Sequence, residues 1–290
     1  MTKLAKRKRE TPESRPRARY ALLTEYDGSL FHGWQRQKNA VTVQQLLEEA
    51  WFDLVGQDVR FTGSSRTDAG VHAAGHVCHF DSYNPIPLAN VPLALNSRLP
   101  AGIAVHDCRE TAPDFDARFQ AVGKRYRYRV AHGSIKPALR RNFAAHLAGP
   151  VDDDAMREAA RLIAGERDFV AFMDQGSVVR RTVRSVPVIR LTASPDARRG
   201  RYPGRELVFD IVGDGFLYHM VRIIVGTIIA VGQGKITTAE LPELIAAGDR
   251  TRLGKTMPPE GLELVKVFYR DELFGDDSAA DYATTVRTML

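Results

Sequence analysis

An acidic and a basic side chain lie two positions apart in one polar segment of the chain. Asp68 follows Arg66 within residues 63–75, which contain three glycines and show no helical periodicity. A neighbouring guanidinium favours the ionised form of a carboxyl group, as a nucleophile or a general base requires. An aspartate that only caps a turn is the alternative interpretation, because Asp is common in glycine-rich turns. The segment by itself does not distinguish the two.

Histidine and cysteine residues near this segment raise the question of a metal site, because imidazole and thiolate both bind zinc. In a strand over 76–81, His76 and Cys78 face one side and His79 faces the other. These residues and His72 are not followed by a second pair of ligands at zinc-finger spacing. We therefore predict ordinary strand histidines and no metal.

Residues 124–129, with the sequence KRYRYR, alternate basic and aromatic side chains. In a strand, Tyr126 and Tyr128 share one face and the three arginines share the other. The rings can stack on bases and the arginines can bind phosphates, although a core-facing tyrosine pair with a solvated arginine edge is the alternative. Further basic groups are spread along the sequence, which is typical of a folded groove for a polyanion. They are Arg140-Arg141, Arg180-Arg181 with Arg184, and Arg198-Arg199-Arg201.

The run from Phe216 to Val231 is almost wholly apolar, yet it contains His219 and Arg222 one helical turn apart. It is too short and too polar to cross a membrane, so we predict a buried core helix. An unpaired buried charge costs several kcal/mol, and Arg222 therefore requires an anion. The candidate partners are Asp68 and, on the preceding strand, Asp210 or Asp214.

Periodicity places these residues on a mixture of strands and helices. We predict strands over 19–26, 58–62, 76–81, 103–108, 124–131, 182–192, 205–212 and 262–269. We predict helices over 43–55, with a capping box of Thr42 and Gln45, and over 150–166, 215–232 and 241–247. Two successive split βαβ units in this order favour an α+β fold with two halves, each an antiparallel sheet with helices on one face.

The chain has 290 residues, of which 44% are hydrophobic, and this is enough for one large core or two ordinary ones. It shows neither a secretory signal nor a membrane-length apolar stretch, so we predict a cytoplasmic protein. Cys78 and Cys108 imply no disulfide framework. We predict four regions: a disordered basic tail at 1–18, an N-terminal half at 19–135, a C-terminal half at 136–270 and an acidic tail at 271–290.

Six short segments follow one another in order between about Arg19 and Tyr269. They are Tyr26-Asp27-Gly28 with Gly33-Trp34-Gln35-Arg36-Gln37, Val43-Gln44, residues 65–73, Ala117-Arg118-Phe119, Arg125-Tyr126-Arg127-Tyr128 and His219-Met220-Val221-Arg222. Together they resemble the tRNA pseudouridine synthase A family, and the six in order are far more specific than any one alone. Ser65 stands where the family usually has glycine. The segments before Arg19 and after Arg270 have no clear counterpart in the family.

The resemblance implies the pseudouridine synthase fold, in which two ferredoxin-like halves with antiparallel or mixed sheets enclose a central active-site cleft, in a homodimer. It implies isomerisation of uridine to pseudouridine in the anticodon stem-loop of tRNA, at family positions 38, 39 and/or 40. The bond from C1′ to N1 breaks, the uracil rotates and C1′ joins C5, so no cofactor is expected. The essential aspartate of the family corresponds to Asp68. Attack on C1′, addition to C6 and abstraction of the 2′ proton all remain open for it.

The resemblance also assigns residues that bind the substrate. Tyr126 matches the tyrosine that stacks on the target base and is a candidate for the late proton transfer at C5. Arg66 matches a residue that holds the target nucleotide out of its stack, and Arg222 matches one that pairs with the aspartate. The residues expected to face RNA are Phe115, Arg118, Phe119, Arg180, Arg181 and Thr182.

Two rival functions remain open for the chain. An RNA-binding paralogue with an altered target or lost catalysis would have little need for the combination of Asp68, Arg66, Tyr126 and Arg222. A small-molecule hydrolase that uses Asp68 and His72 would lack a recognisable arrangement of nucleophile and base.

Overall fold

The computed structural model of the chain describes residues 17–176, 179, 181–195 and 204–290. Most of the predicted basic tail at 1–18, the predicted RNA-binding residue Arg180 and the basic group 198–201 lie outside the described residues. Within the described part of the chain, no helix is long and apolar enough to span a membrane.

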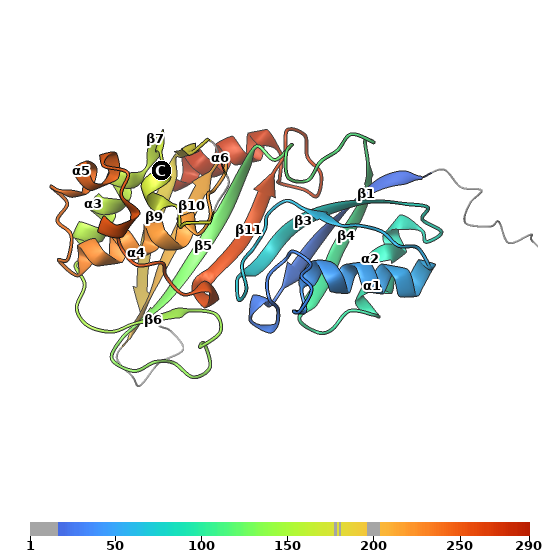
Figure 1. Cartoon of the computed structure of the whole chain (residues 1–290), viewed down its shortest axis with the longest axis horizontal. Helices are drawn as coiled ribbons and strands as arrows, with labels where there is room; N and C mark the ends of the chain where they lie inside the picture. The colour runs from blue at the N-terminus through green and yellow to red at the C-terminus, as the bar shows by residue number, and fades with distance from the viewer. Residues whose placement is uncertain (1–16, 177–178, 180, 196–203) are drawn as a thin grey trace, which may run out of the picture.

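A nine-stranded sheet runs through the length of the molecule (Figure 1). Its strand order is β4 (Ile103–Thr111), β1 (Ala18–Tyr26), β3 (His72–Ser82), β11 (Leu262–Phe268), β5 (Gly123–His132), β10 (Arg205–Gly213) and β9 (Val188–Pro195). Two short strands extend this path, because β2 (Thr62–Gly63) pairs with β3 and β6 (Ala145–Leu147) pairs with β5. A separate two-stranded sheet consists of β7 (Gly165–Asp168) and β8 (Val183–Val186).

Strand β11 joins the N-terminal and C-terminal strands of the sheet. It is antiparallel to β5, with Leu264 opposite Tyr126, and it is parallel to β3, with Glu263 opposite His72. The polar segment that contains Asp68 ends where β3 begins. The sheet therefore brings this segment beside Tyr126 although the two are far apart in sequence.

Helices pack on the sheet at both of its ends. At one end, α1 (Val43–Val55) and α2 (Val91–Asn96) lie beside β1, β3 and β4 (Figure 1). At the other end lie α3 (Asp153–Ile163), α4 (Met220–Gly232) and α5 (Leu241–Ala246). In the described part of the chain, five 3-10 turns connect the elements, at Gly28–Leu30, Leu88–Asn90, Val170–Phe172, Arg250–Arg252 and Pro259–Gly261. Helix α6 (Ala279–Met289) follows the last strand.

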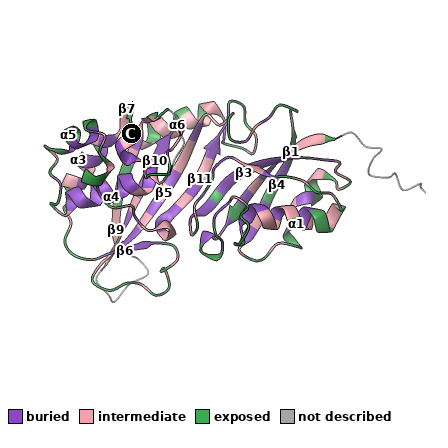
Figure 2. Ribbon diagram, in the orientation of Figure 1, coloured by how far each residue is buried: buried purple, intermediate pink, exposed green. Residues whose placement is uncertain are grey.

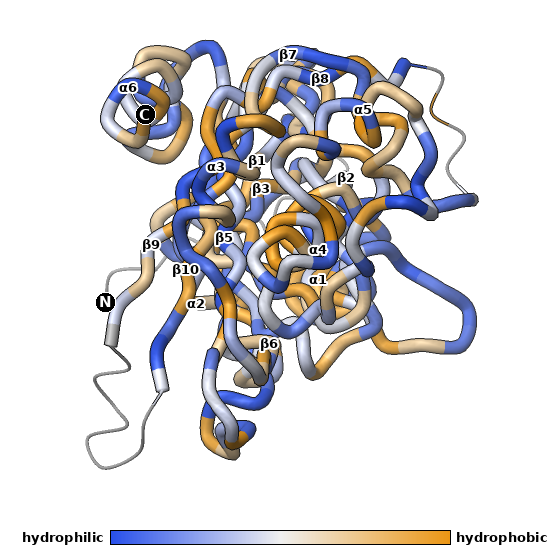
Figure 3. Tube along the Cα trace, turned by 90° about the vertical axis from the view of Figure 1, so that its left-hand side faces the viewer, coloured by the Kyte–Doolittle hydropathy of each residue, from blue (hydrophilic) through white to orange (hydrophobic). Residues whose placement is uncertain are grey.

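The core follows the central strands and α4. Figure 2 shows that the middle of each long strand is buried, and Figure 3 shows α4 as a strongly hydrophobic helix within the fold. Every residue of α4 is buried except Arg222. A Cβ atom at Gly226 would lie 1.9 Å from the carbonyl oxygen of Lys255, so the close approach of this chain segment to α4 requires glycine there.

The α+β fold class is confirmed, and most predicted elements are present. The predicted strands at 19–26, 103–108, 124–131, 205–212 and 262–269 are β1, β4, β5, β10 and β11. The predicted helices at 43–55, 150–166 and 241–247 are α1, α3 and α5. Thr42 caps α1 as predicted, since its side chain accepts a hydrogen bond from the Gln45 amide. The Gln45 side chain instead donates to Glu49, so the reciprocal half of the capping box is not formed.

Three predicted elements have different limits in the structure. Residues 58–61 are not in a strand, because the Phe61 backbone bonds to side chains of Gln44 and Glu48 on α1. The predicted strand at 182–192 is divided between β8 and β9 at Pro187, which has no amide hydrogen to donate. The predicted loop at 63–75 ends earlier, because β3 begins at His72 rather than at residue 76.

The C-terminal region 271–290 packs against the sheet. Ser278 and Asp281 form a capping box at the start of α6. The Tyr282 ring lies 5.4 Å from the Phe268 ring and covers Gly123, where a Cβ atom would come within 2.3 Å of it. Asp277 is buried and accepts hydrogen bonds from the amides of Leu273 and Phe274.

Candidate active site

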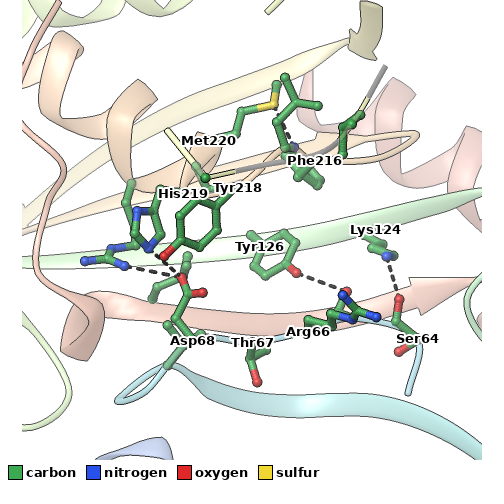
Figure 4. A pocket seen from close by; sticks show the side chains of 18 of the residues that line it. Ser64, Arg66, Thr67, Asp68, Lys124, Tyr126, Phe216, Tyr218, His219 and Met220 are labelled. Atoms are coloured by element: carbon green, nitrogen blue, oxygen red, sulfur yellow. Dashed lines mark hydrogen bonds and ion pairs between the residues drawn. The ribbon is translucent and has the colours of Figure 1, made fainter. Parts of the chain in front are cut away.

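A cavity of about 500 Å³ lies beside the junction of β3, β11 and β5. Three segments line most of it: residues 64–68 before β3, Lys124 and Tyr126 on β5, and residues 216–222 at the start of α4 (Figure 4). A volume of about 300–1,000 Å³ is typical of sites for small molecules and cofactors. The cavity is therefore large enough for a single nucleoside.

The segment that carries Asp68 is held on several sides. The Trp34 amide donates to the Thr67 carbonyl oxygen at 3.1 Å, and the Tyr26 hydroxyl lies 2.8 Å from the Thr67 hydroxyl. On the other side, the Lys124 ammonium donates to the Ser64 carbonyl oxygen at 2.7 Å. The segment has no regular secondary structure at residues 64–68, so these bonds give it a fixed shape.

Asp68 and Arg222 form an ion pair across the cavity. Arg222 Nη1 lies 3.3 Å from Asp68 Oδ2, and Arg222 Nε donates to the Met257 carbonyl oxygen at 2.6 Å. Of the three partners considered for Arg222, the structure therefore selects Asp68, while Asp214 accepts a hydrogen bond from the Ser185 amide. Asp210 instead bonds to the guanidinium groups of Arg125 and Arg127.

His219 is a second group on the same carboxylate oxygen. Its Nε2 atom lies 3.3 Å from Asp68 Oδ2, and its Nδ1 atom lies 2.8 Å from Asp174 Oδ2. His219 has a φ of 60° and precedes the helix, which begins at Met220. The prediction of a helix from residue 215 was therefore wrong for residues 215–219, because the left-handed backbone of His219 interrupts the helical conformation before Met220.

Asp174 is itself fixed by other residues. It accepts hydrogen bonds from Arg250 Nε at 2.8 Å and from the Thr256 hydroxyl at 2.8 Å. Burial raises the pKa of Asp174, but hydrogen bonds from His219, Thr256 and Arg250 outweigh burial and lower the pKa overall. Asp174 is therefore ionised at neutral pH.

Tyr126 projects from β5 toward the cavity, while Tyr128 does not line it. The Tyr126 hydroxyl donates to Ser65 Oγ at 3.2 Å, and its ring packs edge-on against Phe216 with centroids 5.1 Å apart. Burial raises the pKa of Tyr126 to about 12, with a contribution from Asp68, so the phenol is neutral at physiological pH. Tyr128 is fully buried and donates to the Pro258 carbonyl oxygen, so the core interpretation holds for that tyrosine.

The arginines on the other face of β5 have carboxylate partners. Arg125 and Arg127 pair with Asp210, and Arg129 pairs with Glu206 and Glu263. They therefore do not form the unpaired phosphate-binding face that the alternation suggests. The basic residues that line the cavity are instead Arg66, Arg118, Lys124 and Arg222.

Lys124 has an unusual environment for a lysine. Burial, together with the positive charges of Arg118 and Arg184, lowers the pKa of Lys124 to about 8. Lys124 and Arg118 both line the cavity, and Lys124 bonds to Ser64 in the segment before Asp68 (Figure 4).

The residues expected to face RNA are not all at this cavity. Arg118 lines it, and the neighbouring Phe119 is 80% exposed, with the Arg118 guanidinium over its ring. Phe115 is buried against Tyr269 and His79 and lines a different cavity. Arg181 is exposed, and Thr182 lies next to it just before β8.

Each histidine considered for metal binding has a protein partner. His72 Nδ1 accepts from the Gly28 amide, His79 Nδ1 accepts from the Ala117 amide, and His76 Nε2 lies 3.0 Å from the Ser65 carbonyl oxygen. The described residues contain no group of three or more His, Cys, Asp or Glu side chains arranged to hold a metal ion.

Sequence reasoning did not single out several residues at this site. Asp174 lies in a segment without a motif, and its link to the cavity depends on a long-range contact with His219. Lys124 was noted within the alternating strand, but the depth of its burial was not apparent. For His219, the available signal was its position one helical turn from Arg222 in an otherwise apolar segment, where both polar side chains need partners.

Known proteins resemble this chain over most of its length. The sequence family described as tRNA pseudouridine synthase matches residues 22–120 and 159–270. A protein of Acetivibrio thermocellus named tRNA pseudouridine synthase A is 43% identical over 248 residues, which cover 86% of this chain and 98% of that protein. A protein of Syntrophomonas wolfei with the same name is 43% identical over 255 residues, covering 88% and 99%. Given this extent of similarity and the cavity geometry, the chain belongs to the tRNA pseudouridine synthase family, a family of isomerases that act on uridines in tRNA.

Proposed function

We propose that this protein isomerises uridines of the tRNA anticodon stem-loop, at positions 38, 39 and/or 40, and that Asp68 is the essential carboxylate. The observation that carries the proposal is the position of Asp68, at the edge of a nucleoside-sized cavity and opposite Tyr126. The acidic group, the aromatic ring and a partly buried arginine then surround one volume. Isomerisation needs these groups together, whereas RNA binding alone does not.

The reaction conserves all atoms of the nucleotide. The bond from C1′ to N1 breaks, the uracil turns within the cavity, and C1′ forms a bond to C5. The proton on C5 leaves, and N1 gains a proton. In this proposal the Asp68 carboxylate acts at the sugar or the base, with Arg222 stabilising its negative charge, since charge stabilisation is a major component of catalysis.

Tyr126 has two roles in the proposal. Its ring forms an apolar wall on which the uracil stacks while it turns, as bases stack on aromatic side chains in other RNA-binding proteins. Its neutral hydroxyl donates to Ser65 Oγ and is a candidate relay for the proton that leaves C5, because it can accept that proton while its own proton passes to Ser65. We place the target base between this ring and Asp68.

A base in a stem-loop reaches the cavity only after extrusion from its stack, which costs a few kcal/mol. In the proposal Arg66 fills the space that the extruded base leaves in the stem-loop and holds the nucleotide out of its stack. Arg118, which lines the cavity, contacts the RNA backbone, and the neighbouring exposed Phe119 contacts an unstacked base. Arg180, Arg181 and Thr182 extend the contact along the RNA. Phe115 supports this surface from the core, since its ring packs against Tyr269, whose hydroxyl donates to the Ala117 carbonyl oxygen.

The proposal includes a cytoplasmic homodimer, following the family resemblance. Size-exclusion chromatography with light scattering tests the dimer, because a monomeric mass at micromolar concentration would contradict it. Fractionation of cells that express a tagged protein tests the location.

Mapping of pseudouridine tests the proposed target. Purified protein is incubated with tRNA transcripts in which uridine at position 38, 39 or 40 is changed one at a time to cytidine. Modification should disappear at the changed position and persist at the others. Modification elsewhere in the tRNA would contradict the anticodon-stem assignment, and binding without any modification would support the RNA-binding paralogue.

A further inference from the structure

We propose that His219 and Asp174 are positioning residues that fix the Asp68 carboxylate, so that Oδ2 is held by the protein and Oδ1 faces the substrate. This inference rests on the proposed role of Asp68 as the essential carboxylate. It assigns a function to a histidine and an aspartate that the family comparison does not describe.

Both contacts of the Asp68 side chain with basic groups involve one oxygen. Arg222 Nη1 and His219 Nε2 each lie 3.3 Å from Oδ2. No described residue is recorded within hydrogen-bond distance of Oδ1, and Figure 4 shows this oxygen on the cavity side of the carboxylate. A hydrogen bond from Arg222 and a close contact with His219 on the same oxygen restrict rotation of the carboxylate, so the other oxygen keeps a single direction.

The hydrogen atoms of His219 follow from its partners. Asp174 is ionised and accepts from Arg250 and Thr256, so it also accepts from His219, which places a hydrogen on Nδ1. His219 therefore bridges two carboxylates, with Nδ1 donating to Asp174 and Nε2 lying 3.3 Å from Asp68 Oδ2.

The charged groups around His219 come from four chain segments. Asp68 belongs to the segment before β3, Asp174 to the segment after the 3-10 turn Val170–Phe172, Arg222 to α4, and Arg250 to the 3-10 turn Arg250–Arg252. Asp174 and Arg250 thus act at a distance from the cavity, through His219. Tyr218 stacks on the histidine ring at 3.7 Å and limits its rotation.

The backbone conformation of His219 supports a functional role for this residue. Its φ of 60° lies in the left-handed region, which residues other than glycine adopt uncommonly, although histidine, asparagine and aspartate adopt it more often than the rest. This conformation aims the imidazole at both carboxylates. Residues in sparsely populated backbone conformations are concentrated at functional sites.

Two substitutions at His219 distinguish the contact of its side chain with Asp68 from the effect of its backbone conformation. Asparagine tolerates the left-handed conformation, but its side chain is too short to reach Asp68, so His219→Asn removes the donor without straining the chain. The amide nitrogen of glutamine reaches the position of Nε2, so His219→Gln restores a neutral donor. We expect kcat for tRNA isomerisation to fall about 10- to 100-fold in His219→Asn and to recover to within about threefold of wild type in His219→Gln, given the effect of one hydrogen bond to a charged group.

A second variant tests the indirect role of Asp174. Asp174→Asn should lower kcat about 3- to 10-fold in the wild-type background and should have no further effect in the His219→Asn background, because the link to Asp68 is already broken. KM for tRNA should change little in all of these variants. His106→Phe is the control, since His106 pairs with Glu25 on an exposed part of β4.

The outcomes separate the inference from the proposed function. Asp68→Ala must be inactive, and if it retains activity, the proposed function is wrong. If Asp68→Ala is inactive but His219→Asn has wild-type kcat, the positioning role is wrong. An equal loss of kcat in His219→Asn and His219→Gln would also overturn the positioning role. So would a further loss of kcat when Asp174→Asn is added to His219→Asn. Thermal unfolding and tRNA binding of every variant show whether it is folded.

Discussion

Arg222 Nη1 lies 3.3 Å from Asp68 Oδ2, although 154 residues separate these two side chains in the sequence. Arg222 lies on α4 and Asp68 precedes β3, so the pair connects the two parts of the molecule that meet at the cavity. Arg222 also donates to Met257, which leaves its guanidinium little freedom to move. The ion pair thus depends on correct assembly of the whole sheet.

Shortening Arg222 tests the contribution of this pair. Lysine keeps the positive charge, but it lacks the planar guanidinium with which Arg222 bonds to Met257 and Asp68 at the same time. We expect Arg222→Lys to lower kcat about 100- to 1,000-fold, comparable to the loss of one donor that stabilises developing charge. Single-turnover kinetics measures the effect. Unchanged kcat would show that Arg222 has a structural role alone. Arg252→Lys is the control, because this arginine lies in an exposed 3-10 turn.

Substitution of Tyr126 separates the ring from the hydroxyl. Tyr126→Phe keeps the ring against Phe216 and removes the hydrogen bond to Ser65. If the hydroxyl transfers the C5 proton, kcat should fall about 10²- to 10⁴-fold while tRNA binding remains, as for loss of a general acid or base. Tyr126→Leu also removes the aromatic ring, so it should lower both kcat and the affinity for tRNA. Equal activity of Tyr126→Phe and wild type would exclude the proton-transfer role and leave stacking.

The ion pairs on the other face of β5 should affect stability rather than chemistry. Asp210 is 7% exposed and bonds to both Arg125 and Arg127. Asp210→Asn should lower the free energy of unfolding by about 2–3 kcal/mol, since it leaves two partly buried arginines without a charge partner. Urea denaturation measures the loss, and Asp107→Asn is the control, because Asp107 is a partly exposed residue of β4 that pairs with the exposed Arg109. A large loss of kcat in folded Asp210→Asn would contradict this assignment.

His76 predicts a pH dependence of stability. It is fully buried against Trp34, with ring centroids 3.9 Å apart, and burial lowers its pKa to about 3. The unfolded chain protonates this histidine below its usual pKa of about 6.5, whereas the folded chain does not, so the unfolded state binds more protons between these values. Stability should therefore fall as the pH decreases from about 6.5 toward 3, with a slope of up to about 1.4 kcal/mol per pH unit from this residue.

Denaturation at several pH values checks the slope. His76→Phe removes the titrating group and should flatten the dependence between pH 6 and pH 4. An unchanged slope in this variant would show that other groups dominate in that range. Since His76 Nε2 bonds to the Ser65 carbonyl oxygen, the variant also tests whether loss of this bond loosens the Asp68 segment.

Local sequence patterns predicted the elements with strong periodicity or clear caps. The apolar spacing of α1, with Thr42 before it and Gly56 after it, is sufficient to locate that helix. In the same way, the alternating residues of β5 predicted that Tyr126 and Tyr128 share a face. These features depend on neighbouring residues, which the sequence contains directly.

Features that depend on distant contacts were predicted less well. The strand limits at 58–61 and at Pro187 follow from side chains of α1 and from a second sheet. The carboxylate partners of the β5 arginines come from β10 and β11. For the partner of Arg222, the residues alone left Asp68, Asp210 and Asp214 open, and only the family resemblance favoured Asp68. The fold places Asp68 3.3 Å from Arg222.

The most direct test of the account is release of tritium from C5 of uridine in labelled tRNA by the wild-type protein and by Asp68→Asn, which has nearly the same shape. The account predicts release by the wild type and a decrease of about 10⁴-fold or more for the variant, as for removal of an essential catalytic group. Filter binding should show similar affinity for tRNA in both proteins. Equal release by the two proteins would contradict the assignment of Asp68 as the essential carboxylate.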